Sequence, residues 1–168
     1  MAKNTKEKII IVNSNDEIIG SKLRGTLIDD QDIYRVAALW LNNSQGDILL
    51  AQRHHSKKND PGKWGPAVAG TVEEGETYES NIIKEAQEEI GLINIKPEIG
   101  PKIMIEGERR YFTQWYRLVV DKDIEDFKIQ ENEVEALQWF GPRELTEELK
   151  NNPDKFLKRM GKYLQLFS

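Results

Sequence analysis

The sequence has no cysteine and no long apolar run, and these two absences remove several classes of protein. Without cysteine there is no disulfide framework, no thiolate metal site and no cysteine nucleophile. The apolar run at residues 9–12 is too short for the core of a signal peptide, and no segment approaches the about 18 residues that cross a bilayer. We therefore expect a cytoplasmic protein without a membrane partner.

Positive charge is also scarce. The 24 Lys and Arg residues are outnumbered by 29 Asp and Glu, and the formal net charge is -5. This balance gives no general attraction for nucleic acid, so we expect none as a partner. A polyanionic substrate would instead need a metal ion or a local basic patch.

What the chain does contain is enough apolar surface for one folded domain. It has 168 residues, of which 38% are hydrophobic, and it includes 4 Trp, 5 Tyr and 5 Phe. We expect a single domain over residues 1–168. Within it, residues 1–30 would form an N-terminal hairpin extension and residues 142–168 the C-terminal helices.

Strand signals recur along the chain, with one strong helix signal among them. The expected strands are residues 9–12, 17–20, 33–41, 48–53, 66–70, 102–105, 111–120 and 135–140. Residues 54–65 are typical of a loop, and Pro153 is expected to divide the C-terminal region into two helices. This order favours an α+β or three-layer sandwich over a parallel βαβ array.

The helix is expected over residues 77–90, where Thr77 can cap its start and Gly91 can end it. Its apolar residues share one face: Ile82, Ile83, Ala86 and Ile90. Beside this face three acidic residues fall within roughly 100° of one another: Glu85, Glu88 and Glu89.

Helix stability alone does not explain these three glutamates, because like charges at such spacing repel by about 0.2–0.5 kcal/mol per pair. A hard cation such as Mg²⁺, which prefers oxygen ligands, would convert the repulsion into coordination. The alternative interpretation is a solvated acidic face of a surface helix.

The spacing around the glutamates resembles the Nudix box, written G-x5-E-x7-R-E-U-x-E-E-x-G-U, where U is a bulky aliphatic residue. Every fixed Gly and Glu position is matched, by Gly70, Glu76, Glu85, Glu88, Glu89 and Gly91. Two positions differ: Lys84 stands where the family has Arg, and Ala86 is smaller than the aliphatic residue of the pattern. A lysine keeps the charge of Arg but lacks its forked hydrogen bonding.

This resemblance implies an α/β/α sandwich with a mixed sheet and a loop–helix–loop catalytic motif. It also implies a Mg²⁺-dependent hydrolase, with Mn²⁺ as an alternative ion. Such an enzyme cleaves a phosphoanhydride in a nucleoside diphosphate or a nucleotide-linked diphosphate by water attack on phosphorus. Because the metal lowers the pKa of its bound water, no covalent nucleophile is required.

Carried onto this chain, the resemblance implies that Glu85 and Glu89 are the main Mg²⁺ ligands. Glu88 would bind a further metal or hold metal-bound water, and the carbonyl of Gly70 would complete the shell. Glu76 would steady the motif through Lys84. A base or extra ligand can come from a later loop, where four residues stay open as candidates: Glu106, Glu108, Glu131 and Glu133.

A longer stretch, Gln52 to Lys58 followed by Pro61-Gly62-Lys63-Trp64, resembles the Nudix subgroup related to isopentenyl-diphosphate isomerase. That resemblance implies that Arg53, with Lys57 or Lys58, binds the diphosphate. Trp64 is expected to pack beneath the site. Isomerase activity itself is not expected, because the Cys and the metal-binding His of the isomerases are replaced here by Ala69 and Thr71.

The two histidines, His54 and His55, are adjacent in sequence. Adjacent side chains of an extended segment point to opposite sides, so we expect no shared metal site. Two other functions are weighed against the hydrolase: a non-catalytic nucleotide- or diphosphate-binding regulatory protein, which Lys84 leaves open, and an isopentenyl-diphosphate isomerase. In each case the partner is a small-molecule diphosphate, and the chain would be a monomer or a homodimer.

Overall fold

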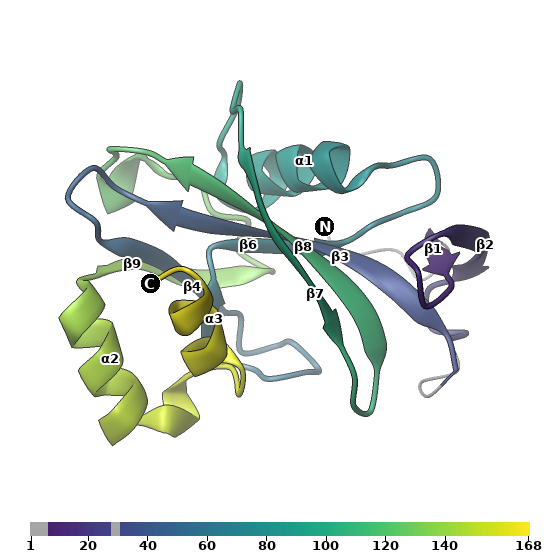
Figure 1. The fold of residues 1–168 in the computed structure, drawn as a ribbon. Coiled ribbons are helices and arrows are strands. Elements are labelled where there is room, and N and C mark those ends of the chain that lie inside the picture. The colour runs from purple at the N-terminus through teal and green to yellow at the C-terminus, as the bar shows by residue number, and fades with distance from the viewer. Residues whose placement is uncertain (1–6, 28–30) are drawn as a thin grey trace.

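The structure is a computed structural model that describes residues 7–27 and 31–168 (Figure 1). Parts of the expected N-terminal extension, residues 1–6 and 28–30, lie outside the described residues. The strands are β1 (Lys8–Val12), β2 (Ile18–Leu23), β3 (Ile33–Asn42), β4 (Ile48–Arg53), β5 (Trp64–Pro66), β6 (Val68–Thr71), β7 (Glu98–Ile105), β8 (Arg110–Val119) and β9 (Val134–Phe140). The helices are α1 (Tyr78–Ile90), α2 (Pro142–Asn151) and α3 (Met160–Leu166), with short 3-10 turns η1 (Ile124–Asp126) and η2 (Pro153–Lys155). In this described part of the chain, no helix has the length and apolar character that crossing a membrane requires.

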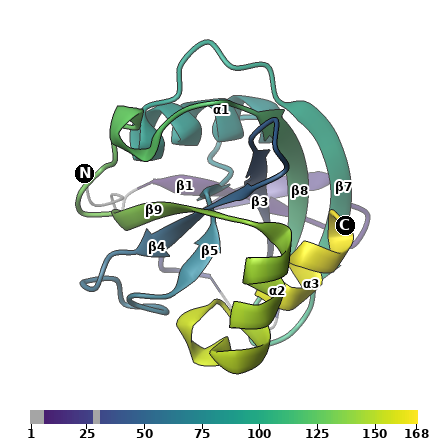
Figure 2. The same ribbon diagram turned by 90° about the vertical axis from the view of Figure 1, so that its left-hand side faces the viewer.

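Strand β3 is the centre of the sheet. It pairs antiparallel with β1 and β6, and parallel with β8 along its whole length, so the sheet is mixed. With β4 it shares one pair, Asn42 with Ile48, next to their connecting turn. Beyond that pair β4 turns away and instead joins β5 and β9 (Figure 2).

Two apolar cores lie on opposite faces of β3, because side chains alternate along a strand. One core packs under α1 and includes Ala37, Leu39, Leu41, Ile82, Ala86 and Ile90. The other packs under the C-terminal helices and includes Ala38, Trp40, Trp115, Leu145, Phe156 and Met160. Helix α1 thus covers one side, and α2 and α3 cover the other (Figures 1 and 2). The expected α+β sandwich with a mixed sheet is confirmed.

Helix α1 forms where its local signals place it. The Thr77 side chain accepts a hydrogen bond from the Ser80 amide at 3.0 Å, and the Ser80 hydroxyl accepts one from the Thr77 amide at 2.9 Å. At the other end Gly91 has a φ of 73°, a left-handed conformation that glycine adopts without strain. The expected start, end and buried face of this helix are confirmed.

The segment before α1 differs from the prediction. Residues 66–70 were expected to form one extended piece after a loop at residues 54–65. In the structure two strands, β5 and β6, occupy this region, and β5 already begins at Trp64. They are separate strands because β5 pairs with β4 whereas β6 pairs with β3, and the chain crosses between them at Ala67.

Two later boundaries also differ. Strand β7 begins at Glu98 rather than near residue 102. Residues 100 and 101 are a Gly-Pro pair typical of turns, but here they lie inside the strand, at an irregularity in its pairing with β8. Helix α3 begins at Met160 rather than near residue 156. The backbone of residues 156 and 157 instead pairs with Trp64, and the Leu157 amide donates to the Trp64 carbonyl at 2.9 Å.

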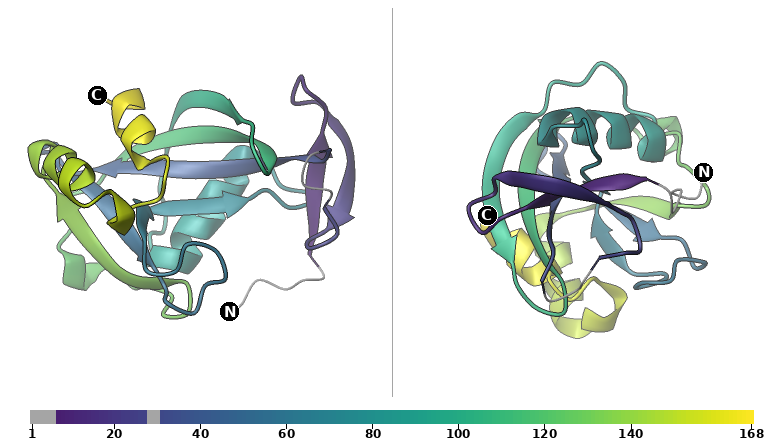
Figure 3. Two further views of the ribbon diagram at one scale, coloured as in Figure 1. Left: turned by 90° about the horizontal axis from the view of Figure 1, so that it is seen from below. Right: turned by 90° about the vertical axis from the view of Figure 1, so that its right-hand side faces the viewer.

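The hairpin of β1 and β2 lies at the end of the molecule away from α2 (Figure 3). Besides the pairing of β1 with β3, one carboxylate holds its turn against the body. Asp16, in its turn, has a side chain only 8% exposed. It accepts hydrogen bonds from Arg35 Nε at 2.7 Å, from Lys102 Nζ at 2.7 Å and from the Tyr78 hydroxyl at 2.9 Å. Elements β3, β7 and α1 therefore converge on one group.

Burial alone would raise the pKa of the Asp16 carboxyl. The hydrogen bonds from Lys102, Arg35 and Tyr78 outweigh burial and hold this pKa below its ordinary value of 3.8. The opposite holds for the Tyr78 hydroxyl, whose pKa is raised far above 10.0 by burial and by its hydrogen bond to Asp16. The carboxylate is thus stabilised in its charged form.

We predict that Asp16→Asn lowers the free energy of unfolding at pH 7 by about 1–3 kcal/mol, because Arg35 and Lys102 lose a buried counter-ion. Urea unfolding measures this difference. Since the folded-state pKa lies below the unfolded value, the carboxylate stabilises the fold at neutral pH, and this contribution is lost as the pH falls below about 4. The gap between the two proteins should therefore narrow in acid.

The control is Asp123→Asn, an exposed aspartate whose side chain makes no capping hydrogen bond. An Asp16→Asn protein as stable as this control at pH 7 would contradict the attachment described above.

Candidate functional site

A cleft of about 590 Å³ lies where β3 and β4 separate. Its lining comes from β3, β4, β5, β6, the end of α1, the loop after β4 and the residues before β9. Six candidate site residues from the sequence line it together: Gly70, Glu89, Arg53, Lys57, Lys58 and Glu133. The fold therefore brings acidic and basic candidates into one cavity.

The acidic side is built by α1 against β6. Glu85 is 1% exposed and Glu89 is 9% exposed, whereas Glu88 lies on the exposed side of the helix. A Cβ atom on Gly70 would come within 2.5 Å of the Glu85 Cγ and 2.8 Å of its Oε1. Gly70 is thus required for close approach, since only glycine leaves room for the carboxylate between strand and helix.

Lys84 joins the acidic side chains around the start of α1. It forms an ion pair with Glu76, and its Nζ lies 3.4 Å from Glu73 and 3.9 Å from Glu85. Glu76 also accepts hydrogen bonds from the Glu73 amide at 2.9 Å and from Asn81 Nδ2 at 2.8 Å. The expected contact between Glu76 and Lys84 is therefore present, and one ammonium group faces three carboxylates.

These contacts shift both groups toward their charged forms. Burial alone would raise the pKa of Glu76, but the hydrogen bonds from Lys84, the Glu73 amide and Asn81 hold it below its ordinary value. Burial alone would lower the pKa of Lys84, yet its hydrogen bond to Glu76 and the nearby carboxylates raise it. An arginine is not needed to keep this position positively charged.

The donor set of α1 suits a hard divalent cation. Glu85, Glu88, Glu89 and the Gly70 carbonyl offer oxygen atoms only, which is the chemistry that Mg²⁺ prefers. Within the described residues, the three glutamates do not form a group whose donor atoms all lie within 4.8 Å of one another. This wider spacing still fits Mg²⁺, because that ion keeps several water ligands in its octahedral shell.

The basic side comes from β4 and the loop that follows it. Arg53 Nε donates to the Asn59 carbonyl at 3.0 Å and so holds the loop, while Lys57 forms an ion pair with Glu133. Lys58 is exposed at the rim. These side chains would present positive charge to a diphosphate in the cleft.

A further arginine in the cleft was missed from the sequence. Arg24 follows β2 and lines the cleft with Arg53. Its Nε lies 3.7 Å from a Glu7 oxygen, and its buried Nε and Nη2 make no hydrogen bond within the described part of the chain. No local pattern marks this residue, because its position follows from how the N-terminal hairpin packs.

The four candidate glutamates of the later loops differ in their positions. Glu133 lines the cleft next to Lys57, whereas Glu131 is exposed. Glu106 and Glu108 lie exposed in the turn between β7 and β8, and Glu106 lies 3.5 Å from Arg110, the first residue of β8. Trp64 packs edge-on against the Phe140 ring, 5.6 Å between centroids, so its predicted packing role is confirmed.

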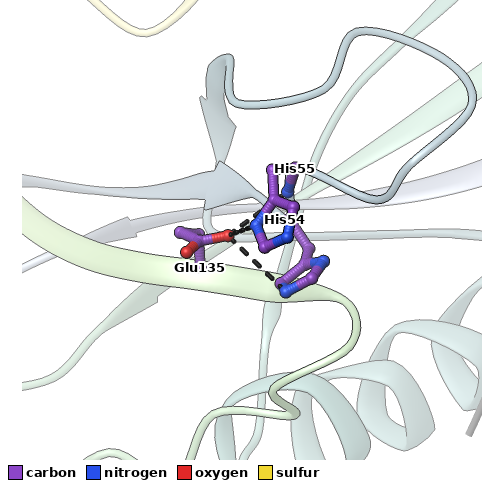
Figure 4. Close-up of side chains that lie close together, drawn as sticks. All are labelled: His54, His55 and Glu135. Atoms are coloured by element: carbon purple, nitrogen blue, oxygen red, sulfur yellow. Dashed lines mark hydrogen bonds and ion pairs between the residues drawn. The ribbon is translucent and has the colours of Figure 1, made fainter.

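The expectation that His54 and His55 point apart is wrong. Strand β4 ends at Arg53, so the two histidines are no longer in extended backbone, and their ring centroids lie 4.0 Å apart (Figure 4). Both rings face Glu135 of β9, whose Oε2 lies 2.8 Å from His55 Nδ1 and 3.6 Å from His54 Nε2.

Comparison with known proteins gives consistent matches. Residues 33–160 match the family model described as the NUDIX domain. The chain is 36% identical over 86 residues to a Nudix hydrolase of Deinococcus radiodurans, a match that covers 51% of this chain and 50% of that relative, so the chain spans about half its length. It is 27% identical over 158 residues to an isopentenyl-diphosphate Delta-isomerase of Serratia proteamaculans, covering 89% and 85%. A crystal structure of a Deinococcus radiodurans protein superposes with a TM-score of 0.79 at 24% identity, covering 95% and 98%.

We predict that Gly70→Ala lowers the free energy of unfolding by about 1–3 kcal/mol, because the new methyl group overlaps the buried Glu85 side chain. Thermal and urea unfolding measure the loss. Gly20→Ala is the matched control, since Gly20 also lies in a strand but has no atom within 4 Å of the added carbon. Equal stability of the two variants would contradict the close approach of β6 to Glu85.

Proposed function

The chain belongs to the Nudix family of hydrolases, and on that premise we propose that it is a Mg²⁺-dependent enzyme that cleaves a phosphoanhydride bond in a nucleoside diphosphate or a nucleotide-linked diphosphate. Family membership confirms the resemblance of the Gly70 to Leu92 segment and implies hydrolysis of nucleoside diphosphate-linked substrates. The observation that supports the finer proposal is the cleft, where Glu89 and Gly70 lie on one wall and Arg53, Lys57 and Lys58 on another.

We assign metal binding to Glu85, Glu88, Glu89 and the Gly70 carbonyl. A bound Mg²⁺ supplies neutralisation of phosphate oxygens and a lowered pKa of bound water. The chain's own contribution is orientation: α1 and β6 hold the Glu85 carboxylate between them. Mn²⁺ offers the same coordination chemistry and is an alternative ion.

We assign the diphosphate to Arg53, Lys57 and Lys58, with Arg24 as an addition from the structure. A guanidinium donates two parallel hydrogen bonds to phosphate oxygens, which fixes the direction of the substrate as well as its charge. Lys57 already pairs with Glu133, so a substrate phosphate would compete with that carboxylate for the ammonium group. Glu133 is accordingly our candidate for the late-loop residue.

The isomerase alternative has less support, although one relative carries that name. Ala69 and Thr71, which stand at the positions of the isomerase Cys and His, both line the cleft. Neither side chain supplies the acid or base that proton transfer at carbon requires.

Product analysis tests the proposal directly. The purified chain is incubated with nucleoside di- and triphosphates, nucleotide sugars, dinucleotides and prenyl diphosphates, with Mg²⁺ and with a chelator. We expect a nucleoside monophosphate product that forms with Mg²⁺ and disappears with the chelator. Binding of these compounds without turnover would support the regulatory alternative, and proton exchange into isopentenyl diphosphate would support the isomerase.

We predict that Glu89→Gln lowers kcat by more than the about 10–100-fold that is typical of a residue one shell outside a metal site. The reason is that an amide removes one negative charge from the proposed ligand set. Glu79→Gln, in the first turn of the same helix and exposed, is the matched control and should keep its activity. Circular dichroism establishes that both variants fold, and full activity of folded Glu89→Gln would rule out this metal ligand.

A further inference from the structure

Among the described residues, His54, His55 and Glu135 form a group of three metal-ligating side chains whose donor atoms lie within 4.8 Å of one another. Both histidines of the chain belong to it. We propose that this group is a second metal site, suited to a transition-metal ion such as Zn²⁺, which fastens the loop at residues 54–63 to β9. The site would exist whatever reaction the cleft performs.

The distances fit an ion of that size. Glu135 Oε2 lies 2.8 Å from His55 Nδ1 and 3.6 Å from His54 Nε2. Ligand atoms around a tetrahedral Zn²⁺, with bonds of about 2.0–2.1 Å, lie about 3.3 Å from one another. These two donor–donor distances bracket this value, and all three donor atoms lie within 4.8 Å of one another.

The surroundings position the three donors. The His55 amide donates to Glu135 Oε2 of β9 at 3.2 Å, and the His54 amide donates at 3.1 Å to the carbonyl of Glu133, the residue before β9. His54 Nδ1 lies 2.7 Å from the Ser56 hydroxyl. With its proton on Nδ1, donated to that hydroxyl, His54 directs the Nε2 lone pair toward Glu135, in the way that second ring nitrogens orient metal-bound histidines.

The tautomer with the proton on His54 Nδ1 loses one hydrogen bond. The Ser56 amide also lies 3.1 Å from His54 Nδ1, and it can donate there only when that nitrogen carries no proton. Metal binding therefore exchanges the amide contact for a metal bond. The His55 side chain is 75% exposed, so an ion reaches the group directly from solvent.

The donor atoms of this group differ from those of the three glutamates on α1. Two imidazoles and one carboxylate suit Zn²⁺ and its neighbours in the transition series, whereas Mg²⁺ prefers an octahedral shell of oxygen atoms. With three protein ligands, a fourth position stays open for water. Zn²⁺ should thus bind here in the presence of excess Mg²⁺.

A metal ion bound at this site would order the basic side of the cleft. The loop carries Lys57 and Lys58 and follows directly on Arg53, while Glu135 is two residues beyond Glu133, the partner of Lys57. An ion shared by the loop and β9 would therefore fix the place where these cations face the cleft.

The test is a Zn²⁺ titration of the full chain without an affinity tag, in excess Mg²⁺, followed by calorimetry and by the NMR signals of the histidine rings. Because the chain has two histidines and both belong to the group, their ring signals report on this site alone. We expect one Zn²⁺ per chain and a shift of both ring signals, with no shift from Mg²⁺ alone. A wild-type chain that binds no Zn²⁺, or binds it without moving these signals, would overturn the proposal.

Variants locate the site. We expect His55→Ala and Glu135→Gln each to weaken Zn²⁺ binding at least tenfold, whereas Glu131→Gln, exposed just before β9, and Glu89→Gln in the acidic helix should retain it. Circular dichroism of each variant establishes that it folds. Unchanged Zn²⁺ affinity in folded His55→Ala, or loss of Zn²⁺ binding in Glu89→Gln, would place the ion elsewhere and refute the assignment.

Discussion

The approach of the Gly70 backbone to the buried carboxylate of Glu85 is the constraint on which the rest of the site depends. Without a side chain at this position, β6 can lie against α1 with a charged group between them. That contact fixes the rotation of the helix about its axis. The same rotation sends Ile82, Ala86 and Ile90 into the core and brings Glu89 to the cleft.

The fold, and not the overall composition, decides which charged side chains line the cleft. The chain is acidic overall, yet the cleft collects Arg24, Arg53, Lys57 and Lys58 from two separate segments. On the acidic side, Lys84 reaches Glu73, Glu76 and Glu85 and offsets part of their negative charge. A negative net charge and a cavity lined by several cations are therefore compatible within one domain.

Local signals made α1, its caps and its acidic face predictable, because a capping threonine, a helical period and a terminal glycine act within a few residues. The fold class followed from the order of strand and helix signals, and the Nudix resemblance from the spacing of Gly and Glu residues. Three features could not be read in this way. The position of Arg24 depends on how the hairpin of β1 and β2 packs, the break at Ala67 depends on two pairing partners, and the meeting of His54 with His55 depends on where β4 ends. Each is decided by tertiary contacts.

The parallel pairing of β3 with β8 has a kinetic consequence. Ile33 lies opposite Arg110 and Asn42 opposite Val119, so the central strand gains this neighbour only after most of the chain has been synthesised. The hairpins and α1 involve shorter loops, whose closure has a smaller entropic cost. By this argument we expect α1, with its acidic motif, to form before β3 gains β8 as its neighbour.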